Sequence, residues 1–381
     1  MILQVAIQSA PAIELVAALR LGALRLGALR LIALRLAALL SIVVPVGAQS
    51  HATGAQPGPG RVPPRAVVQI PADAPPAIAR LLGLYVAGTA QVLIAERDGR
   101  AWAVFDDGIP ARLDVRGDTL RPRSPTGPGA LIATRDASGR VKALTLAGVQ
   151  YRRRALGPDA GNQLVVAPVR PLEQLRQEAL AASPPVESNR DATPDLAELV
   201  TLDSTIHLEI RYATANNLFG ERFYSQARAF LQRPAAAALV RASAALKPYG
   251  VGLLVHDGYR PWYVTKMFWD AASPEVRPFV ANPAEGSKHN RGAAVDLSLY
   301  DWKTGRPIEM PSTYDETTLR ASPDWAGGTS RQRWYRDLLR RAMEAEGFTV
   351  YQLEWWHFDF TGWEQYPILN VPFERLGSIA R

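Results

Sequence analysis

Hydrophobic and polar positions alternate over short runs in the first half of the chain. Between residues 78 and 154, runs such as QVLIAE and RAWAVF are each followed by a turn sequence, Arg-Asp-Gly at 97–99 and Asp-Asp-Gly at 106–108. KALTLAG follows a Ser-Gly pair in the same way. Runs of about four to seven residues between such turns are typical of antiparallel strands joined by hairpins. The pattern predicts a small antiparallel β domain over residues 78–154.

The second half of the chain combines helical periodicity with strand-like runs. RPAAAALVRASAALKPY, WYVTKMFWDAA and RQRWYRDLLRRAMEAEG predict helices, the last of which ends at Gly347, a common helix stop. VGLLVHD, AAVDLSLY and FTVYQLEWWHFDF predict strands. Eight of the nine tryptophans lie beyond Gly250, which fits a compact enzyme domain with a well-packed pocket. We predict an α+β fold, in which a central antiparallel sheet is flanked by helices in a domain spanning residues 197–381.

The remaining segments predict a leader and two linkers. Residues 1–48 contain a near-repeat of Leu-Arg-Leu-Gly-Ala and end in an uncharged run, a proline and small residues, which predicts a signal peptide cleaved after Ala48. An uncleaved anchor and an overlong gene start remain alternatives. Residues 49–77 are rich in Pro, Gly and Ala, and residues 155–196 contain one helical stretch, EQLRQEALAA, so both are predicted to be linkers. We expect a periplasmic or secreted protein with no stable membrane span after cleavage.

Composition narrows the chemistry that the chain can use. The 381 residues include no cysteine, so disulfides, thiolate nucleophiles and thiolate metal sites are excluded. A metal must be bound through His, Asp or Glu, and the five histidines are His51, His207, His256, His289 and His357. Of the formal net charge of +7, the leader contributes +3, and we expect the remaining +4 to be dispersed. Dispersed basicity indicates solubility, and no nucleic-acid partner is expected.

Two histidines and an aspartate have the pattern of a metal site. In GAAVDLSLY, alternate strand residues share a face, so Asp296 lies opposite the apolar set that includes Val295 and Leu297. His289 enters through a turn in which Gly292 permits a close backbone approach. With His357 as a third ligand, the set would bind zinc and leave its fourth position open for water.

Two further residues would make such a metal site hydrolytic. Glu354 is three residues before His357 in LEWWH, so on a strand the chain must bend for both to reach the metal; Glu354 would be the general base. Arg260, presented by the Asp257-Gly258 turn, could stabilise an oxyanion. Each residue also has an ordinary structural role, because lone histidines are commonly structural and turn arginines are commonly solvated. Their joint occurrence favours the zinc site.

At these residues the sequence resembles the VanX-type D-alanyl-D-alanine dipeptidases, within the zinc peptidases that also include D,D-carboxypeptidases and hedgehog-like domains. The resemblance is carried by SKHNRGAAVDLSLY, EWWH, DGYRP and IRYATANNLFGERFY, and it covers about residues 199–372. GLYVAG and GRVKALTLAGVQYRRR in residues 78–154 loosely resemble a β domain appended to β-lactamase-like serine hydrolases. We interpret that domain as an accessory that contacts the cell wall or a partner.

The dipeptidase resemblance implies roles by position. It makes His289, Asp296 and His357 the ligands of one Zn²⁺, Glu354 the catalytic base and Arg260 the stabiliser of the tetrahedral intermediate. It also places Ser287, Asp315 and Tyr212 at the dipeptide, with Asp315 near its ammonium end, although serine and aspartate in loops have ordinary capping roles. Two features depart from the family: His256 stands where an aromatic is usual, and the loops around Pro311 and 321–330 differ in composition. We expect His256 to pack structurally, His207 to lie in a strand, and His51 to lie in the first linker.

Three functions remain open from the sequence. The first is zinc-dependent hydrolysis of free D-alanyl-D-alanine, linked to peptidoglycan metabolism. The second keeps the chemistry and changes the substrate to peptidoglycan stem peptides, as in a D,D- or L,D-carboxypeptidase. The third is a non-catalytic, zinc-containing wall-binding protein, which the presence of Glu354 argues against.

Overall fold

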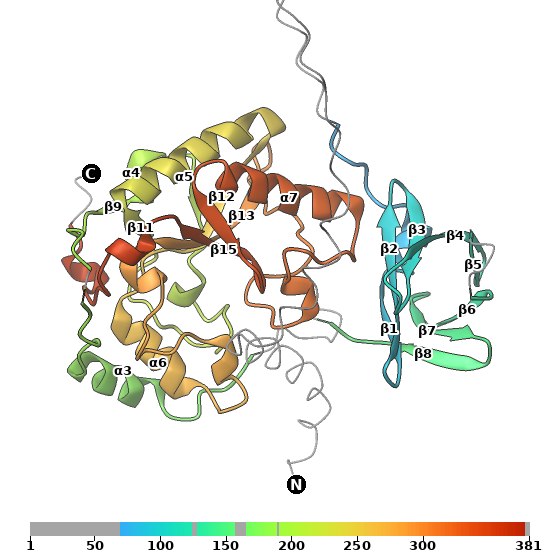
Figure 1. Ribbon diagram of the computed structural model, residues 1–381, viewed down its shortest axis with the longest axis horizontal. Coiled ribbons are helices and arrows are strands. Elements are labelled where there is room, and N and C mark those ends of the chain that lie inside the picture. Colours follow the sequence, from blue (N-terminus) through green and yellow to red (C-terminus); the bar gives the residue numbers. More distant parts are fainter. Residues whose placement is uncertain (1–68, 124–127, 157–164, 189, 378–381) are drawn as a thin grey trace, which may run out of the picture. The chain divides into compact units, whose positions relative to one another are not determined.

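The computed structural model describes residues 69–123, 128–156, 165–188 and 190–377 (Figure 1). The predicted signal peptide, its cleavage point after Ala48, residues 49–68 of the first linker and His51 lie outside these ranges. Within the described ranges, no helix has the length and apolar character needed to cross a membrane.

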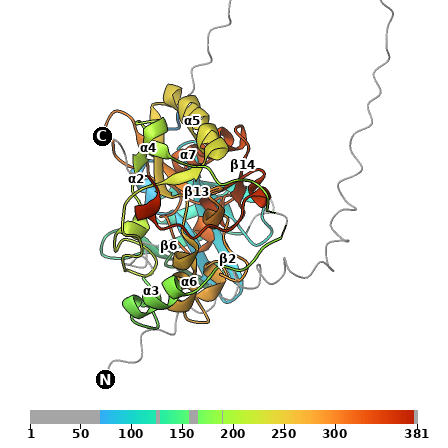
Figure 2. The ribbon, with the colours of Figure 1, turned by 90° about the vertical axis from the view of Figure 1, so that its left-hand side faces the viewer.

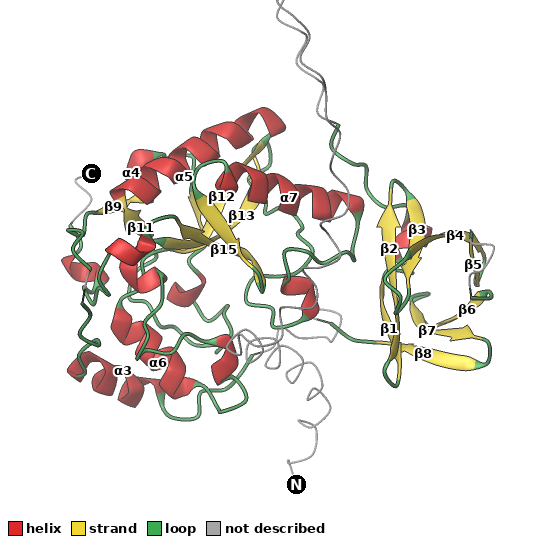
Figure 3. Cartoon of the chain, viewed as in Figure 1, coloured by secondary structure: helices red, strands yellow, loops and turns green. Residues whose placement is uncertain are grey.

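The predicted antiparallel β domain is present and forms a closed barrel (Figure 3). Every neighbouring pair of strands is antiparallel, and β1 closes the barrel by pairing with β8 at Tyr85 and Arg153. The strands are β1 (Gly83–Ala87), β2 (Ala90–Arg97), β3 (Arg100–Val104), β4 (Pro110–Arg116), β5 (Thr119–Pro122), β6 (Leu131–Arg135), β7 (Val141–Leu146) and β8 (Val149–Arg153), after a short helix α2 (Pro76–Ala79). Apolar side chains such as Val92, Ile94 and Leu144 fill its interior. Closure leaves no open sheet edge.

The net charge is divided unevenly along the chain. Residues 78–154 contain 13 Lys and Arg against 7 Asp and Glu, a net of +6, whereas residues 155–381 contain 24 against 27, a net of −3. The positive excess outside the leader was expected to be dispersed. It is instead concentrated in the barrel segment.

A five-stranded sheet, in the order β10-β12-β13-β15-β14, lies at the centre of the second half. Its strands are β10 (His207–Leu208), β12 (Val251–Asp257), β13 (Ala294–Asp301), β14 (Phe348–Tyr351) and β15 (Glu354–Phe360), and a separate pair is formed by β9 (Leu196–Glu198) and β11 (Phe230–Gln232). The sheet was predicted to be antiparallel, and three of its four pairings are; β10 pairs parallel with β12. The segment 348–360 was predicted as one strand and is two, β14 and β15, joined by a turn.

Helices pack their apolar sides into one core with this sheet (Figures 1 and 2). They are α3 (Leu172–Ala181), α4 (Leu199–Leu202), α5 (Arg233–Leu246), α6 (Trp262–Ala271) and α7 (Ser330–Glu344). Helix α5 begins with a proline in its first turn, and α7 begins with a capping box between Thr329 and Gln332. Both views place α5 and α7 beside each other, and α3 beside α6. Strands β12 and β13 are buried along almost their whole length, so the site described below lies at the end of well-packed strands.

Candidate active site

Three acidic or imidazole side chains form a row across adjacent strands. Asp257 ends β12 and pairs with Asp296 of β13, which in turn pairs directly with His357 of β15. The register of β12 shifts between Val255 and Asp257, so His256 is an extra residue in that strand. A bulge of this kind re-aims the following side chain. The sheet therefore brings together residues that are 39 to 100 positions apart in sequence.

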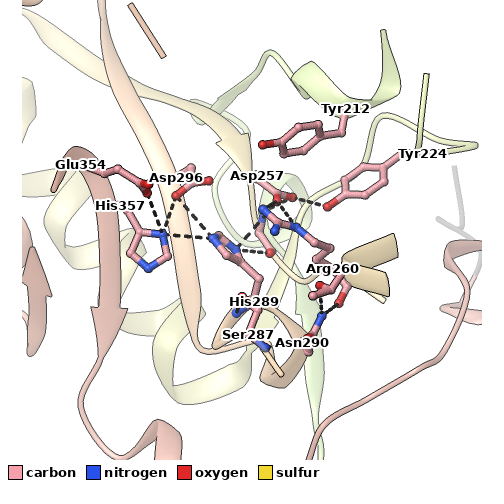
Figure 4. Close-up of polar contacts among 12 residues, drawn as sticks. Tyr212, Tyr224, Asp257, Arg260, Ser287, His289, Asn290, Asp296, Glu354 and His357 are labelled. Carbon is pink, nitrogen blue, oxygen red and sulfur yellow. Dashed lines mark hydrogen bonds and ion pairs between the residues drawn. The ribbon is translucent and has the colours of Figure 1, made fainter. Parts of the chain in front are cut away.

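The bend expected between Glu354 and His357 is present. In the pairing of β14 with β15, Val350 lies opposite Phe358, but the next residue, Tyr351, lies opposite Glu354. One step along β14 thus corresponds to four along β15. As a result, Glu354 Oε2 lies 4.0 Å from His357 Nδ1, and both side chains face Asp296 in Figure 4.

His289 reaches the row from a 3-10 turn, His289–Arg291, that precedes β13. Gly292 ends this turn with φ 65°, where a side chain would be strained, and a Cβ there would lie 2.5 Å from Leu196 Cδ2. Asn290 holds the turn from inside, donating through its side-chain amide to the Arg260 carbonyl and to Thr265 Oγ1, each at 2.8 Å. The position of His289 is therefore fixed by both the backbone and the core.

The three predicted ligands converge. His289 Nε2 lies 3.2 Å from His357 Nδ1 and 3.4 Å from Asp296 Oδ1, and His357 Nδ1 lies 2.9 Å from Asp296 Oδ1. Among the described residues, this set was found as a group able to hold a metal ion. A tetrahedral zinc with bonds of about 2.0 Å separates its ligands by roughly 3.3 Å, so the donor types and spacings fit zinc.

The charges of the group also fit a cation. Burial opposes ionisation of Asp296, but His289 and His357 hold the pKa of its carboxyl well below the usual range. Burial likewise opposes protonation of His357, but hydrogen bonds with Asp296 and Asp359 outweigh it and raise the pKa of His357 to about 10. The site therefore favours positive charge among its donor atoms, and a bound divalent cation would supply that charge.

Arg260 is fixed by a buried ion pair (Figure 4). Its Nε and Nη2 donate to Asp257 Oδ2 at 3.0 and 2.7 Å, while Tyr224 donates its hydroxyl to Asp257 Oδ1 at 2.7 Å. The guanidinium lies over the rings of Phe268 and Tyr212, at 4.9 and 5.2 Å. Arg260 is thus a pre-organised cation beside the row and not a solvated turn residue.

Asp315 and Tyr212 form a second polar group. Tyr212 donates its hydroxyl to Asp315 Oδ1 at 3.1 Å, whereas Asp315 Oδ2 is buried and has no hydrogen-bond partner among the described residues. Burial, with the nearby charges of Asp296 and Glu354, raises the pKa of Asp315 to about 7. The residue also has a positive φ of 60°, which is unusual for a non-glycine residue. Strain together with an unsatisfied carboxylate oxygen is typical of a binding site.

Ser287 and His256 have structural contacts. Ser287 Oγ accepts from the His289 backbone N–H at 3.2 Å, which is a capping role; its predicted contact with substrate stays a prediction. His256 is buried against the Tyr314 ring, and burial with the nearby Arg211 charge lowers the pKa of His256 to about 4. His207 lies in β10, as expected.

Several residues of the site escaped the sequence reasoning. Asp257 was considered only as part of a turn, and Tyr224 only as the last residue of the motif IRYATANNLFGERFY, without a role of its own. Tyr314 donates its hydroxyl to Asp296 Oδ2 at 2.9 Å, and Asp359 Oδ1 lies 3.0 Å from His357 Nε2. Of these residues, only Asp359 could have been selected from the sequence. It is two residues after His357 and therefore lies on the same face of the predicted strand.

Comparison with known proteins identifies the family. The family described as D-ala-D-ala dipeptidase, peptidase M15, matches residues 193–373. A D-alanyl-D-alanine dipeptidase of Escherichia coli (strain K12) is 32% identical over 181 residues, which are 48% of this chain and 92% of that protein. The chain belongs to the D-alanyl-D-alanine dipeptidase family. It is therefore a metallopeptidase, as the motifs predicted.

Other members of the dipeptidase family give the same picture. The D-alanyl-D-alanine dipeptidase of Enterococcus faecalis (strain ATCC 700802 / V583) is 32% identical over 191 residues, 44% of this chain and 92% of that protein. That of Enterococcus faecium is 33% identical over 178 residues, 41% of this chain and 88% of that protein. Every predicted site residue lies within the family match, and the barrel lies outside it.

Proposed function

We propose that this metallopeptidase hydrolyses free D,D-dipeptides, above all D-alanyl-D-alanine, with one zinc ion held by His289, Asp296 and His357. The observation that carries the choice of a free dipeptide is Asp315, whose Oδ2 is buried and has no hydrogen-bond partner in the part of the chain that the structure describes. A free dipeptide brings an ammonium group, which such a carboxylate would bind. The preceding residue, Tyr314, donates its hydroxyl to Asp296. Asp315 is therefore next in sequence to a residue that contacts the proposed metal site.

The residues divide the chemical work. A zinc ion held by His289, Asp296 and His357 would supply a Lewis acid, able to lower the pKa of water and to polarise a peptide carbonyl. Glu354 takes the proton of the attacking water and passes it to the leaving amine. Arg260, held by Asp257, stabilises the negative charge of the tetrahedral intermediate, at no cost of reorganisation. Asp315 and Tyr212 fix the ammonium end of the dipeptide. Ser287 contributes a further contact with the dipeptide.

The substrate proposal is tested with blocked and free peptides. We expect free D-Ala-D-Ala to be hydrolysed with a kcat/KM at least about 100-fold above that of N-acetyl-D-Ala-D-Ala, because the blocked peptide leaves Asp315 without its partner. A peptidoglycan pentapeptide should be equally poor. Comparable rates on the blocked substrates would refute the dipeptidase proposal and favour a D,D- or L,D-carboxypeptidase.

Asp315→Asn should alter substrate binding and its pH dependence. With a pKa of about 7, Asp315 is ionised above that pH and loses its charge below it, so the KM of the native enzyme should rise as the pH falls through 7. In Asp315→Asn, we expect KM at pH 8 to rise about 10- to 100-fold and to vary little around pH 7. Steady-state kinetics from pH 5.5 to 9 measure this, and Asp191→Asn, at an exposed position, is the matched control. An unchanged KM profile would exclude Asp315 from the substrate site.

We further propose that the protein is exported and that its barrel contacts an anionic polymer of the cell wall. The predicted signal peptide and the net charge of +6 in residues 78–154 support this proposal. Cell fractionation tests the location: recovery of the protein in the periplasm or medium, without its first 48 residues, is expected, and recovery in the cytoplasm would refute export.

Binding to the wall should depend on barrel arginines. The full chain is expected to co-sediment with cell walls that carry phosphate polymers, less so at high salt, and Arg116→Gln with Arg121→Gln should weaken this binding several-fold. Both arginines are exposed. Lys303→Gln with Arg306→Gln, exposed on the family domain, is the control. Equal loss in both pairs, or no binding, would contradict a role of the barrel.

A further inference from the structure

Asp359 contacts the metal-site residue His357 on the side that faces away from the other ligands. Both residues lie on β15, and Asp359 Oδ1 is 3.0 Å from His357 Nε2. His357 Nδ1, at the opposite side of the ring, faces Asp296 and His289. The ring is therefore held between a carboxylate behind it and the ligand group in front.

The two imidazoles of the site use opposite nitrogens. His289 turns Nε2 toward the group and places Nδ1 2.8 Å from the Gly258 carbonyl oxygen, which can only accept. His357 turns Nδ1 toward the group and Nε2 toward Asp359. An imidazole that binds a metal through one nitrogen carries its proton on the other, and an acceptor there fixes the tautomer and the ring orientation. His289 has a backbone carbonyl for this purpose, and His357 has a carboxylate.

Lys288 orients that carboxylate. Its Nζ pairs with Asp359 Oδ2, the oxygen that does not face His357, and the Asp359 side chain is only 12% exposed. Lys288 directly precedes His289, so this ion pair links the turn that carries one ligand to the strand that carries another. The ammonium also lies 5.0 Å from the centre of the Trp363 ring, which limits its movement. Lysine thus balances a charge that would otherwise be buried beside the site.

We propose that Asp359, oriented by Lys288, is a positioning residue that holds His357 with its proton on Nε2 and its Nδ1 toward the metal. The pair strengthens metal binding without touching the metal or the substrate. This inference rests on the proposed zinc site and adds to it two residues outside the ligand set. It predicts coupling between positions 288 and 359.

The test measures zinc affinity in the absence of substrate. For Asp359→Asn, whose amide group faces Lys288 and His357 in place of a carboxylate, we expect the dissociation constant for zinc to rise about 10- to 100-fold in chelator competition. Lys288→Met should raise the dissociation constant for zinc by a smaller factor, and Lys288→Arg, which keeps the positive charge, should retain most of the affinity of the parent protein. In the double variant the two effects should not multiply, since both act through one contact. Glu364→Gln, which removes an exposed acidic charge nearby, is the control and should leave the affinity unchanged.

Structural damage is separated from positioning by a second readout. Thermal unfolding of the metal-free variants should match that of the parent protein within a few degrees. If Asp359→Asn does not fold, Lys288→Met decides the question, because its side chain is 34% exposed. An unchanged zinc affinity in a folded variant, or effects that multiply in the double variant, would overturn the proposal. Tight zinc binding without hydrolysis of D-Ala-D-Ala would instead refute the proposed function and leave this inference standing.

Discussion

Glu354→Gln is expected to lower kcat for D-Ala-D-Ala hydrolysis by about 10²- to 10⁴-fold while leaving the zinc content unchanged. Glutamine keeps the size of the side chain and removes its ability to take a proton. Glu354 Oε2 lies 4.0 Å from His357 Nδ1, close enough to serve a water molecule at the metal site without being one of the three convergent ligands. Steady-state kinetics and metal analysis of the same preparation measure both quantities.

The control for Glu354→Gln is Glu344→Gln, at the end of α7, where the side chain pairs with Arg340 at the surface. It should leave kcat within about twofold of the parent, as for most surface substitutions. A Glu354→Gln enzyme with near-normal kcat would show that another group moves the proton. Loss of zinc together with activity would instead make Glu354 a ligand.

Asp296→Ala is expected to abolish metal binding and thereby to lower the activity at least about 10³-fold. Asp296 is the middle residue of the row, in hydrogen-bond contact with His357 and accepting from Tyr314 on its other oxygen. Alanine leaves two imidazoles without the anion that balances a dication. Metal analysis after gel filtration, with activity assayed in added zinc, measures the loss.

Asp301→Ala, at the half-buried end of the same strand, is the control for Asp296→Ala. It removes a carboxylate that caps the turn at Thr304 and should keep both zinc and activity. Full zinc content and activity in Asp296→Ala would exclude Asp296 from the metal site. Loss in both variants would point to strand stability as the cause.

Most helices and strands of the family domain could be predicted from the sequence, because the local pattern of hydrophobic and polar residues determines them. VGLLVHD was predicted as a strand and coincides with β12, and WYVTKMFWDAA differs from α6 by a single residue at its end. The segment 348–360 was misjudged as one strand, because Gln352-Leu353 lacks the Gly, Pro or Asn that marks a turn. The parallel pairing of β10 with β12 depends on contacts 47 residues apart, which no local pattern records.

The difference between local pattern and long-range pairing also explains which residues of the site could be predicted. His289 with Asp296, and Glu354 with His357, could be selected because the spacing within each pair is short and the chemistry of the four residues is coherent. Asp257 with Tyr224, and Tyr314 with Asp296, are brought together only by the folded sheet and loops. Likewise, strands were visible in residues 78–154, but the pairing of β1 with β8 that closes the barrel joins residues 68 apart.

The most direct test of the central claim is hydrolysis of stereochemically matched dipeptides by zinc-loaded and chelated protein. We predict that the zinc-loaded full chain cleaves D-Ala-D-Ala and releases D-alanine, that L-Ala-L-Ala is cleaved at least about 100-fold more slowly, and that chelation stops the reaction until zinc is restored. Hydrolysis that survives chelation, or zinc-loaded protein that leaves D-Ala-D-Ala intact, would contradict the assignment of this site as a zinc D,D-dipeptidase.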